Sequence, residues 1–268
     1  MKLSIITVCY NNKNGLVKTI DSVRNQTFKD YEFIVIDGGS KDGSKEIIEA
    51  NKDLFSFWCS EPDGGIYQGM NKGIDHAIGE YCLFLNSGDW LAHNDVLKKV
   101  FEKGYNEDVL YGDIIRVKGA RKMILHYSKE LTFADFYRVS AAIHHQAAFI
   151  KHFLFEKYGK YREDTYLNAD WHFFFKTVVQ NNVSTKYFNH VISVCDATGA
   201  SQTYSLSNPK VQLDLKSKQE MIDATIPHLS KPDYDKMCRI SQWEKLKIGI
   251  MWRLSVLIPL KWMMALCK

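Results

Sequence analysis

The first 44 residues constrain the fold most, because two short apolar runs lie on either side of an amphipathic segment. Leu3–Cys9 and Glu32–Ile36 are typical of strands, and Leu16–Thr27 is typical of a helix between them. The second strand runs into an acidic, glycine-rich loop, Asp37–Ser44. In open α/β sheets, ligands bind beyond the carboxyl ends of such strands. This unit therefore predicts both a parallel sheet and the edge of the sheet at which a ligand binds.

The alternation of strand and helix continues to about residue 105 and then changes. A helix over 66–78 and a buried strand, Tyr81–Leu85, lead into the loop Asn86–Asp89. Beyond residue 105 the pattern predicts a hairpin and then a strand, a helix and a further strand, over 109–117 with 121–126, 146–150, 169–181 and 186–195. From about residue 208 the chain is predicted to be helical. The expected fold class is α/β, with a mostly parallel, Rossmann-like central sheet flanked by helices and a helical C-terminal extension.

The net charge of +4 is unevenly distributed along the 268 residues. Residues 209–268 hold 11 Lys and Arg against 6 Asp and Glu, whereas the preceding residues are close to neutral. This pattern favours a local anionic partner at the C-terminal end and argues against general nucleic-acid binding. The hydrophobic content of 46% and charged content of 25% are those of an ordinary globular protein.

The six cysteines are scattered and form no C-x-x-C pair, so we expect reduced thiols and a cytoplasmic location. The N-terminal apolar run is short and ends at asparagines, which is unlike a signal peptide. The last segment, Ile248–Leu266, is interrupted by Arg253, Pro259 and Lys261 and is a poor membrane-spanning helix. Its tryptophans and flanking cations are typical of a segment that lies at a membrane surface, and the alternative is a helix packed on the main domain.

Several loop residues carry chemistry that can be interpreted in two ways. Asp37 can accept hydrogen bonds from a ribose or base, or it can close its strand as an Asx-type turn. Lys72 can neutralise a phosphate or lie on a solvated helix face. For Asp42, the role of a helix N-cap is preferred over that of a ligand contact. His144 and His145 are adjacent on a predicted strand edge, so at most one points into a cleft, and either can simply be packed in the core.

Four sequence segments together resemble the family 2 glycosyltransferases of the GT-A fold. They are SIITVCYN with YEFIVIDGGSKDGS, then PDGGIYQGMNKGI, NSGD and NADWHFF, in the family's order over roughly residues 1–200. Each is weak alone, and the combination is similar to bacterial enzymes that assemble surface polysaccharides of the colanic acid, O-antigen or capsule type. The resemblance implies a catalytic domain over 1–205, with a nucleotide-binding half (1–105) and an acceptor-binding half (106–205), and a membrane-associating tail over 206–268.

The resemblance also implies a set of donor contacts. The nucleotide-sugar would be held by Thr7, Tyr10, Asn11, Asp37, Asp63, Lys72 and Asn86. In the family, a D-x-D-type motif usually written Asp-Ser-Asp-Asp binds a divalent metal, Mn²⁺ or Mg²⁺, that neutralises the leaving diphosphate. Here the motif is Asn86-Ser87-Gly88-Asp89, so Asp89 is the remaining anionic metal ligand and metal affinity is expected to be reduced.

Asp170 matches the family's general base, which removes the proton of the acceptor hydroxyl as that oxygen attacks the anomeric carbon. Asp170 can equally serve the N-terminus of its helix, and the two roles are compatible. Candidate acceptor or diphosphate contacts are His144, His145, Asp113 and Trp171.

The implied function is inverting transfer of a sugar from a nucleotide-sugar, most simply a UDP-sugar, to a glycan or polyprenyl-diphosphate-linked acceptor at the inner face of the plasma membrane. One alternative is a nucleotidyltransferase, which is disfavoured because the turn Cys9–Gly15 lacks a glycine-rich, basic character. The other is a catalytically weak or inactive nucleotide-sugar-binding scaffold, suggested by Asn86 and Gly88 in the metal motif.

Overall fold

The computed structural model describes residues 1–137, 143–197 and 207–239. The N-terminal part alternates strands and helices: β1 Leu3–Cys9, α1 Lys13–Arg24, β2 Tyr31–Asp37, α2 Ser44–Ala50, η1 Lys52–Leu54, β3 Phe57–Ser60, α3 Ile66–His76 and β4 Tyr81–Phe84. The predicted strand–helix–strand unit is confirmed, although α1 begins earlier than expected. Asn12 caps it by accepting a hydrogen bond from the Gly15 N–H.

The second part holds shorter and more varied elements. They are β5 Trp90–Leu91, α4 Val96–Phe101, β6 Val109–Lys118, β7 Arg121–Leu125, α5 Phe133–Tyr137, η2 His145–Ala147, β8 Ala148–Lys151, α6 Phe153–Tyr158, α7 Ala169–Phe174, the π-helix η3 Phe175–Gln180, β9 Thr185–Asp196, α8 Pro209–Thr225 and η5 Ile226–His228. The predicted hairpin is β6 with β7. The single predicted helix over 169–181 is an α-helix followed by a π-helix.

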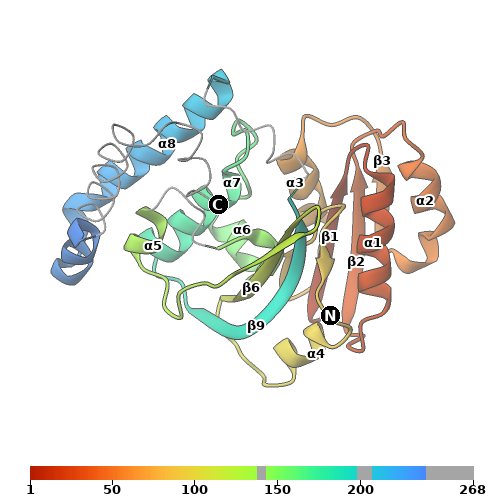
Figure 1. The fold of residues 1–268 in the computed structure, drawn as a ribbon, viewed down its shortest axis with the longest axis horizontal. Coiled ribbons are helices and arrows are strands. Elements are labelled where there is room, and N and C mark those ends of the chain that lie inside the picture. The colour runs from red at the N-terminus through yellow and green to blue at the C-terminus, as the bar shows by residue number, and fades with distance from the viewer. Residues whose placement is uncertain (138–142, 198–206, 240–268) are drawn as a thin grey trace.

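The sheet has the order β3-β2-β1-β4-β8-β6-β9-β5, and β7 pairs with β6. Strands β1 to β4 pair in parallel, as do β6 and β9, whereas β8 is antiparallel to both β4 and β6. The sheet is therefore mixed, which corrects the expectation of a mostly parallel sheet for the second half. The long strand β9 curves across this half of the molecule (Figure 1).

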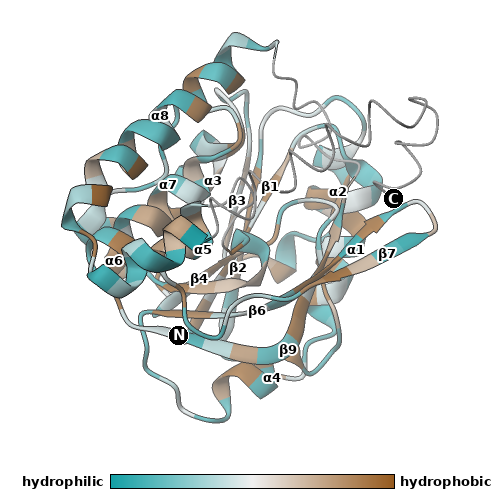
Figure 2. Ribbon diagram, turned by 60° about the vertical axis from the view of Figure 1, so that its left-hand side comes forward, coloured by the Kyte–Doolittle hydropathy of each residue, from teal (hydrophilic) through white to brown (hydrophobic). Residues whose placement is uncertain are grey.

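Helices cover both faces of the sheet, so the central strands β1, β2 and β4 are buried on both sides. Helices α1, α2 and α4 pack on one face, and α3, α5, α6 and α7 pack on the other. Along β1, Ile6 and Val8 belong to one core and Leu3 and Ile5 to the other, as the two-residue period of a strand requires. Figure 2 shows hydrophobic residues along the central strands and alternating polar and apolar residues on α8.

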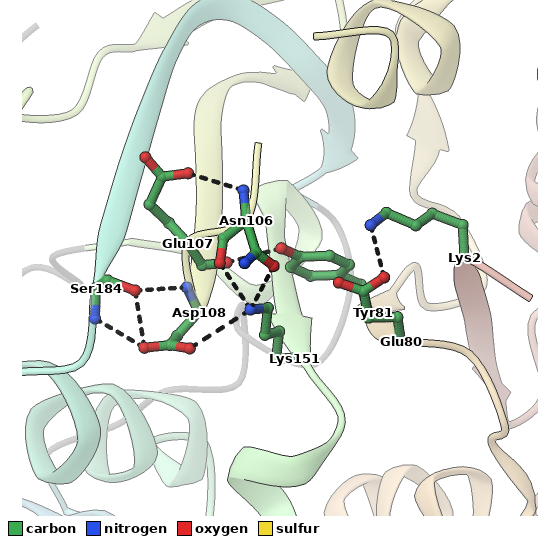
Figure 3. Close-up of polar contacts among 8 residues, drawn as sticks. All are labelled: Lys2, Glu80, Tyr81, Asn106, Glu107, Asp108, Lys151 and Ser184. Carbon is green, nitrogen blue, oxygen red and sulfur yellow. Dashed lines mark hydrogen bonds and ion pairs between the residues drawn. The ribbon is translucent and has the colours of Figure 1, made fainter. Parts of the chain in front are cut away.

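At the amino-terminal end of the parallel strands, a polar network joins the strand starts (Figure 3). Lys151 Nζ donates to Asn106 O at 2.7 Å, and Asp108 accepts from the Ser184 hydroxyl at 2.8 Å. Tyr81 donates to Glu107 O at 2.8 Å, and Lys2 pairs with Glu80. These contacts join the segments at the starts of β4, β6 and β9 to the end of β8.

Among the residues that the structure describes, no helix is long and apolar enough to cross a membrane. The segment Ile248–Leu266, for which a position at the membrane surface is expected, lies outside the described residues. The five cysteines within the described ranges are not paired in disulfides.

Candidate functional site

A chain of three side chains links one loop and the starts of two helical segments at the carboxyl end of the parallel strands. Asn86 Nδ2 lies 3.2 Å from His145 Nε2, and His145 Nδ1 lies 3.0 Å from Asp170 Oδ2. Asn86 follows β4, His145 begins η2, and Asp170 lies in the first turn of α7. Three residues that are distant in sequence and were each selected as candidates therefore form one polar chain, which is buried at His145 and Asp170 and half-buried at Asn86.

Asp170 is held as a carboxylate despite its burial. It is only 8% exposed, which by itself raises its pKa, but the hydrogen bond from His145 and the other polar contacts outweigh that effect. The Trp171 N–H also donates to Asp170 Oδ1 at 2.8 Å, and the pKa of Asp170 is lowered overall. A carboxylate that stays ionised at neutral pH and lies at the strand ends can accept a proton from a bound hydroxyl.

His144 lies differently from its neighbour. It contacts the Tyr127 hydroxyl through Nδ1, and burial lowers its pKa to about 4. Both histidines belong to the start of a 3-10 turn, η2, and not to a strand edge, because β8 begins only at Ala148. That prediction of their local structure was wrong. Of the two, His145 is the one that contacts Asn86 and Asp170.

Asp89 is buried beside the same loops. Its carboxylate interacts with the Cys195 thiol, the Gln146 amide and the Asp196 N–H, and burial raises its pKa to about 6. Its carbonyl oxygen accepts a 2.7 Å hydrogen bond from Thr19 Oγ1, which also accepts from Gly88 N–H. Thr19 and α1 therefore shape the Asn86–Asp89 loop.

The fit of a divalent cation to this loop can be judged from its donor atoms. The described ranges bring together no group of three His, Cys, Asp or Glu side chains able to hold a metal. Asn86 Oδ1 is buried and has no hydrogen-bond partner in the described part of the chain. One carboxylate and one free amide oxygen are hard donors that suit Mg²⁺ or Mn²⁺ when substrate phosphates complete the coordination. The donor set thus fits a cation that arrives with a diphosphate.

The loop after β2 is folded onto the loop before α3. Gly39 has φ +82°, and a Cβ there would lie 3.0 Å from Pro62 N, so only glycine allows this approach. Asp37 is fully buried and accepts hydrogen bonds from Ser40 N at 3.0 Å and Ser60 Oγ at 2.7 Å. Asp63 lies against Gly38, and burial raises its pKa. Asp37 and Asp63 therefore lie where the loop after β2 contacts the loop before α3.

The remaining donor-side candidates differ in their exposure. Tyr10 is 67% exposed, and Asn11 is exposed with φ 48°, where it accepts from Lys41 N–H at 2.8 Å. Thr7 is fully buried and donates its hydroxyl to Leu85 O at 2.7 Å. Lys72 pairs with Glu61 at 2.6 Å. Tyr10 and Asn11 thus face outward, whereas Thr7 links β1 to the end of β4.

Asp42 is not the N-cap residue of α2, as predicted, but precedes that residue. The N-cap of α2 is Gly43, which has no side chain, and Asp42 Oδ1 accepts from Ser44 N–H at 3.1 Å. Asp42 Oδ2 accepts from Lys13 N–H at 2.8 Å. Asp42 therefore joins the start of α1 to the start of α2.

Two of the acceptor-side candidates are occupied within the protein. Asp113 is 2% exposed and accepts from Tyr187 Oη at 2.8 Å, with His126 Nδ1 at 2.6 Å. Trp171 is buried, and its indole N–H donates to Phe136 O at 3.3 Å. Both polar groups are therefore bonded within the protein and are not directed to a bound acceptor in this structure.

Sequence reasoning missed three residues of this region. Gln146, Cys195 and Thr19 contact or support Asp89, and Gln146 Oε1 is buried without a hydrogen-bond partner in the ranges described. The position of Gln146 directly after His145 was an available signal. No pattern in the sequence marks Cys195 or Thr19, because their contacts join segments far apart in the chain.

The fold and this constellation define a GT-A-type α/β protein with a carboxylate site at the strand ends, and the predicted fold class is confirmed. The chain belongs to glycosyl transferase family 2, whose model matches residues 4–162. An uncharacterized glycosyltransferase of Mycobacterium tuberculosis is 34% identical over 189 residues, which are 66% of this chain and 69% of that protein. A PGL/p-HBAD biosynthesis glycosyltransferase of Mycobacterium bovis is 31% identical over 196 residues, 71% of this chain and 75% of that protein.

Solved structures share the fold at low sequence identity. S. aureus TarS 1-349 in complex with UDP-GlcNAc superposes with a TM-score of 0.69 at 20% identity and covers 88% of this chain and 69% of that one. The mannosyltransferase PcManGT from Pyrobaculum calidifontis, in complex with GDP-Man and Mn²⁺, gives a TM-score of 0.54 at 17% identity, with 92% and 80% covered.

Proposed function

We propose that the chain transfers a sugar from a UDP-sugar to a hydroxyl of a glycan or polyprenyl-diphosphate-linked acceptor, with inversion, in the assembly of a bacterial surface polysaccharide. The observation that carries the proposal is the Asn86–His145–Asp170 chain. Membership of family 2 and the UDP-GlcNAc complex of TarS, a protein of the same fold, support it.

Asp170 is the general base of the proposed reaction. Its carboxylate accepts the proton of the acceptor hydroxyl while that oxygen attacks the anomeric carbon from the side opposite the diphosphate. The new glycosidic bond forms as the bond to the diphosphate oxygen breaks, and the nucleoside diphosphate leaves with that electron pair. His145 orients Asp170 and keeps its pKa low, so the base is ionised before the acceptor binds.

The donor occupies the loops that follow β1, β2 and β4. In this proposal, Tyr10 and Asn11 contact the base and ribose and Asp63 borders the nucleotide. The buried Asp37 and Thr7 hold the loops beneath them in place. Asp89 and Asn86 Oδ1 would hold a divalent cation, which would supply positive charge toward the leaving diphosphate. Lys72 reaches the phosphates after exchanging its Glu61 partner.

Calorimetric titration with UDP, in Mn²⁺ and then in EDTA, tests the donor site. GDP is the control, because one protein of the same fold was solved with GDP-Man. Metal-dependent binding that is selective for UDP supports the proposal. Selective binding of GDP replaces the proposed donor, and binding that ignores EDTA removes Asp89 from its role and favours the scaffold alternative.

We also propose that the basic, tryptophan-containing segment 243–266 holds the enzyme at the inner membrane surface. The support is the sequence alone, with its three tryptophans and flanking cations. Co-sedimentation with vesicles containing anionic phospholipid, compared with neutral vesicles, tests this point. Equal recovery of the protein in the supernatant with both vesicles would contradict it.

A further inference from the structure

One face of helix α8 contacts the segment that carries the proposed base. Asp214, Ser217, Lys218 and Met221 are spaced by three and four residues, so they lie on one side of the helix. All four contact residues between Arg162 and His172 or lie over them. This helix lies beyond residue 162, where the match to the family model ends.

Asp214 makes the central contact. It is 1% exposed, and its Oδ2 accepts from Tyr166 N–H at 2.9 Å and Leu167 N–H at 3.1 Å. The same oxygen is 3.3 Å from Asn168 Nδ2, so it binds three consecutive residues. A buried carboxylate is stable only when such donors replace water. Asp214 therefore fixes the backbone of the loop that enters α7.

Asn168 shows the consequence for α7. Asn168 is the N-cap residue, yet its side chain makes no capping bond to the helix, since its amide is directed to Asp214. Asp170 follows two residues later, and it reaches His145 from the first turn of α7. The position of this turn is thus set from outside, by a carboxylate on α8.

Two further contacts hold α8 beside the base. Lys218 Nζ lies 4.8 Å from the centre of the Trp171 ring, a cation–π distance, and His172 Nδ1 lies 3.0 Å from Met221 Sδ. Trp171 and His172 follow Asp170 directly. Residues on both sides of the base are therefore in contact with α8.

We propose that Asp214 is a positioning residue that holds the start of α7 so that Asp170 meets His145 and the acceptor hydroxyl. The inference rests on the proposed role of Asp170 as base. A misplacement of about 1 Å in a reacting group can reduce the rate on the order of 100-fold. Removal of the Asp214 carboxylate is therefore expected to lower kcat while leaving the donor loops, which lie in residues 1–90, unchanged.

The variants are Asp214→Ala and Asp214→Asn, with Asp223→Ala as the matched control. Asp223 lies on the same helix, is exposed, and accepts only from Gln219 among the bonds described. The readouts are hydrogen exchange of the Tyr166 and Leu167 amides, UDP affinity, and kcat with KM for UDP release from UDP-glucose, UDP-galactose and UDP-N-acetylglucosamine.

Asp214→Ala is expected to expose both amides to exchange and to lower kcat about 10- to 100-fold, with unchanged UDP affinity. Asp214→Asn retains an acceptor oxygen and is expected to recover most of the rate, and Asp223→Ala is expected to match the parent protein. If Asp214→Ala fails to fold, its UDP binding is weakened as well. In that case the amide exchange and kcat of Asp214→Asn are used for the test.

Two results overturn the inference: unchanged exchange at Tyr166 and Leu167, or faster exchange with unchanged kcat. If the parent protein binds no nucleotide and releases no UDP, the proposed function has failed. The exchange of the two amides still decides, in that case, whether Asp214 holds this segment.

Discussion

Substitution of His145 by alanine tests the link between the buried base and its partner. The change removes the hydrogen bond at 3.0 Å and leaves Asp170 in a site where burial alone raises its pKa. A hydrogen bond to a charged group contributes about 1.5–3 kcal/mol, and one pKa unit corresponds to about 1.4 kcal/mol. The pKa of Asp170 should therefore rise in the variant, because burial then acts without the opposing hydrogen bond.

The sign of the effect on activity follows from the role of the base. Asp170 accepts a proton only when ionised, so transfer is present above its pKa and is lost as the pH falls through it. The acid limb of the kcat/KM profile should move to higher pH in His145→Ala. The profile is measured as UDP release across the pH range in which the fold is retained.

His126→Ala is the control, because His126 pairs with another buried carboxylate, Asp113, at 2.6 Å. Its acid limb should stay in place. An unmoved limb in His145→Ala, with UDP binding intact, would refute the reasoning that His145 sets the ionisation of Asp170.

Three further predictions concern residues 1–105. Asp89→Asn should abolish the difference in UDP affinity between Mn²⁺ and EDTA, and calorimetry that still shows the difference would contradict the metal role. Thr19→Val removes the hydroxyl that is hydrogen-bonded to Asp89 O and Gly88 N–H. Urea titration should show a free energy of unfolding lower by about 1–3 kcal/mol, and an unchanged midpoint would contradict this. Gly73→Ala places a Cβ 2.4 Å from Ile6 Cγ2 and should lower the free energy of unfolding by about 1–3 kcal/mol. An unchanged melting temperature would contradict the close packing of α3 on β1.

The first half of the fold could be predicted because its signals are local. Each buried parallel strand is a short apolar run, and each is followed by a helix with its own period. The second half could not be predicted to the same extent, since β8 enters between β4 and β6 in antiparallel orientation. No local pattern specifies that pairing, which is decided by packing between segments far apart in sequence.

The candidate site shows the same division. Asp170 and Asn86 could be selected from their match to motifs of the family, and His145 from its position beside a predicted strand. Their joining could not, because Asn86 and His145 are 59 residues apart and His145 and Asp170 are 25 apart. Asp214 has no sequence signal at all, since an acidic residue inside a predicted helix is ordinarily exposed.

The most direct test of the account compares UDP binding and sugar transfer in the Asp170→Asn variant and the parent protein. The substituted amide keeps the shape of the side chain but cannot accept the proton of the acceptor hydroxyl. The account predicts that UDP affinity stays within about twofold while transfer falls by at least about 100-fold, in the range that general base catalysis supplies. Transfer near the parent rate, with UDP still bound, would contradict the assignment of Asp170 as the base.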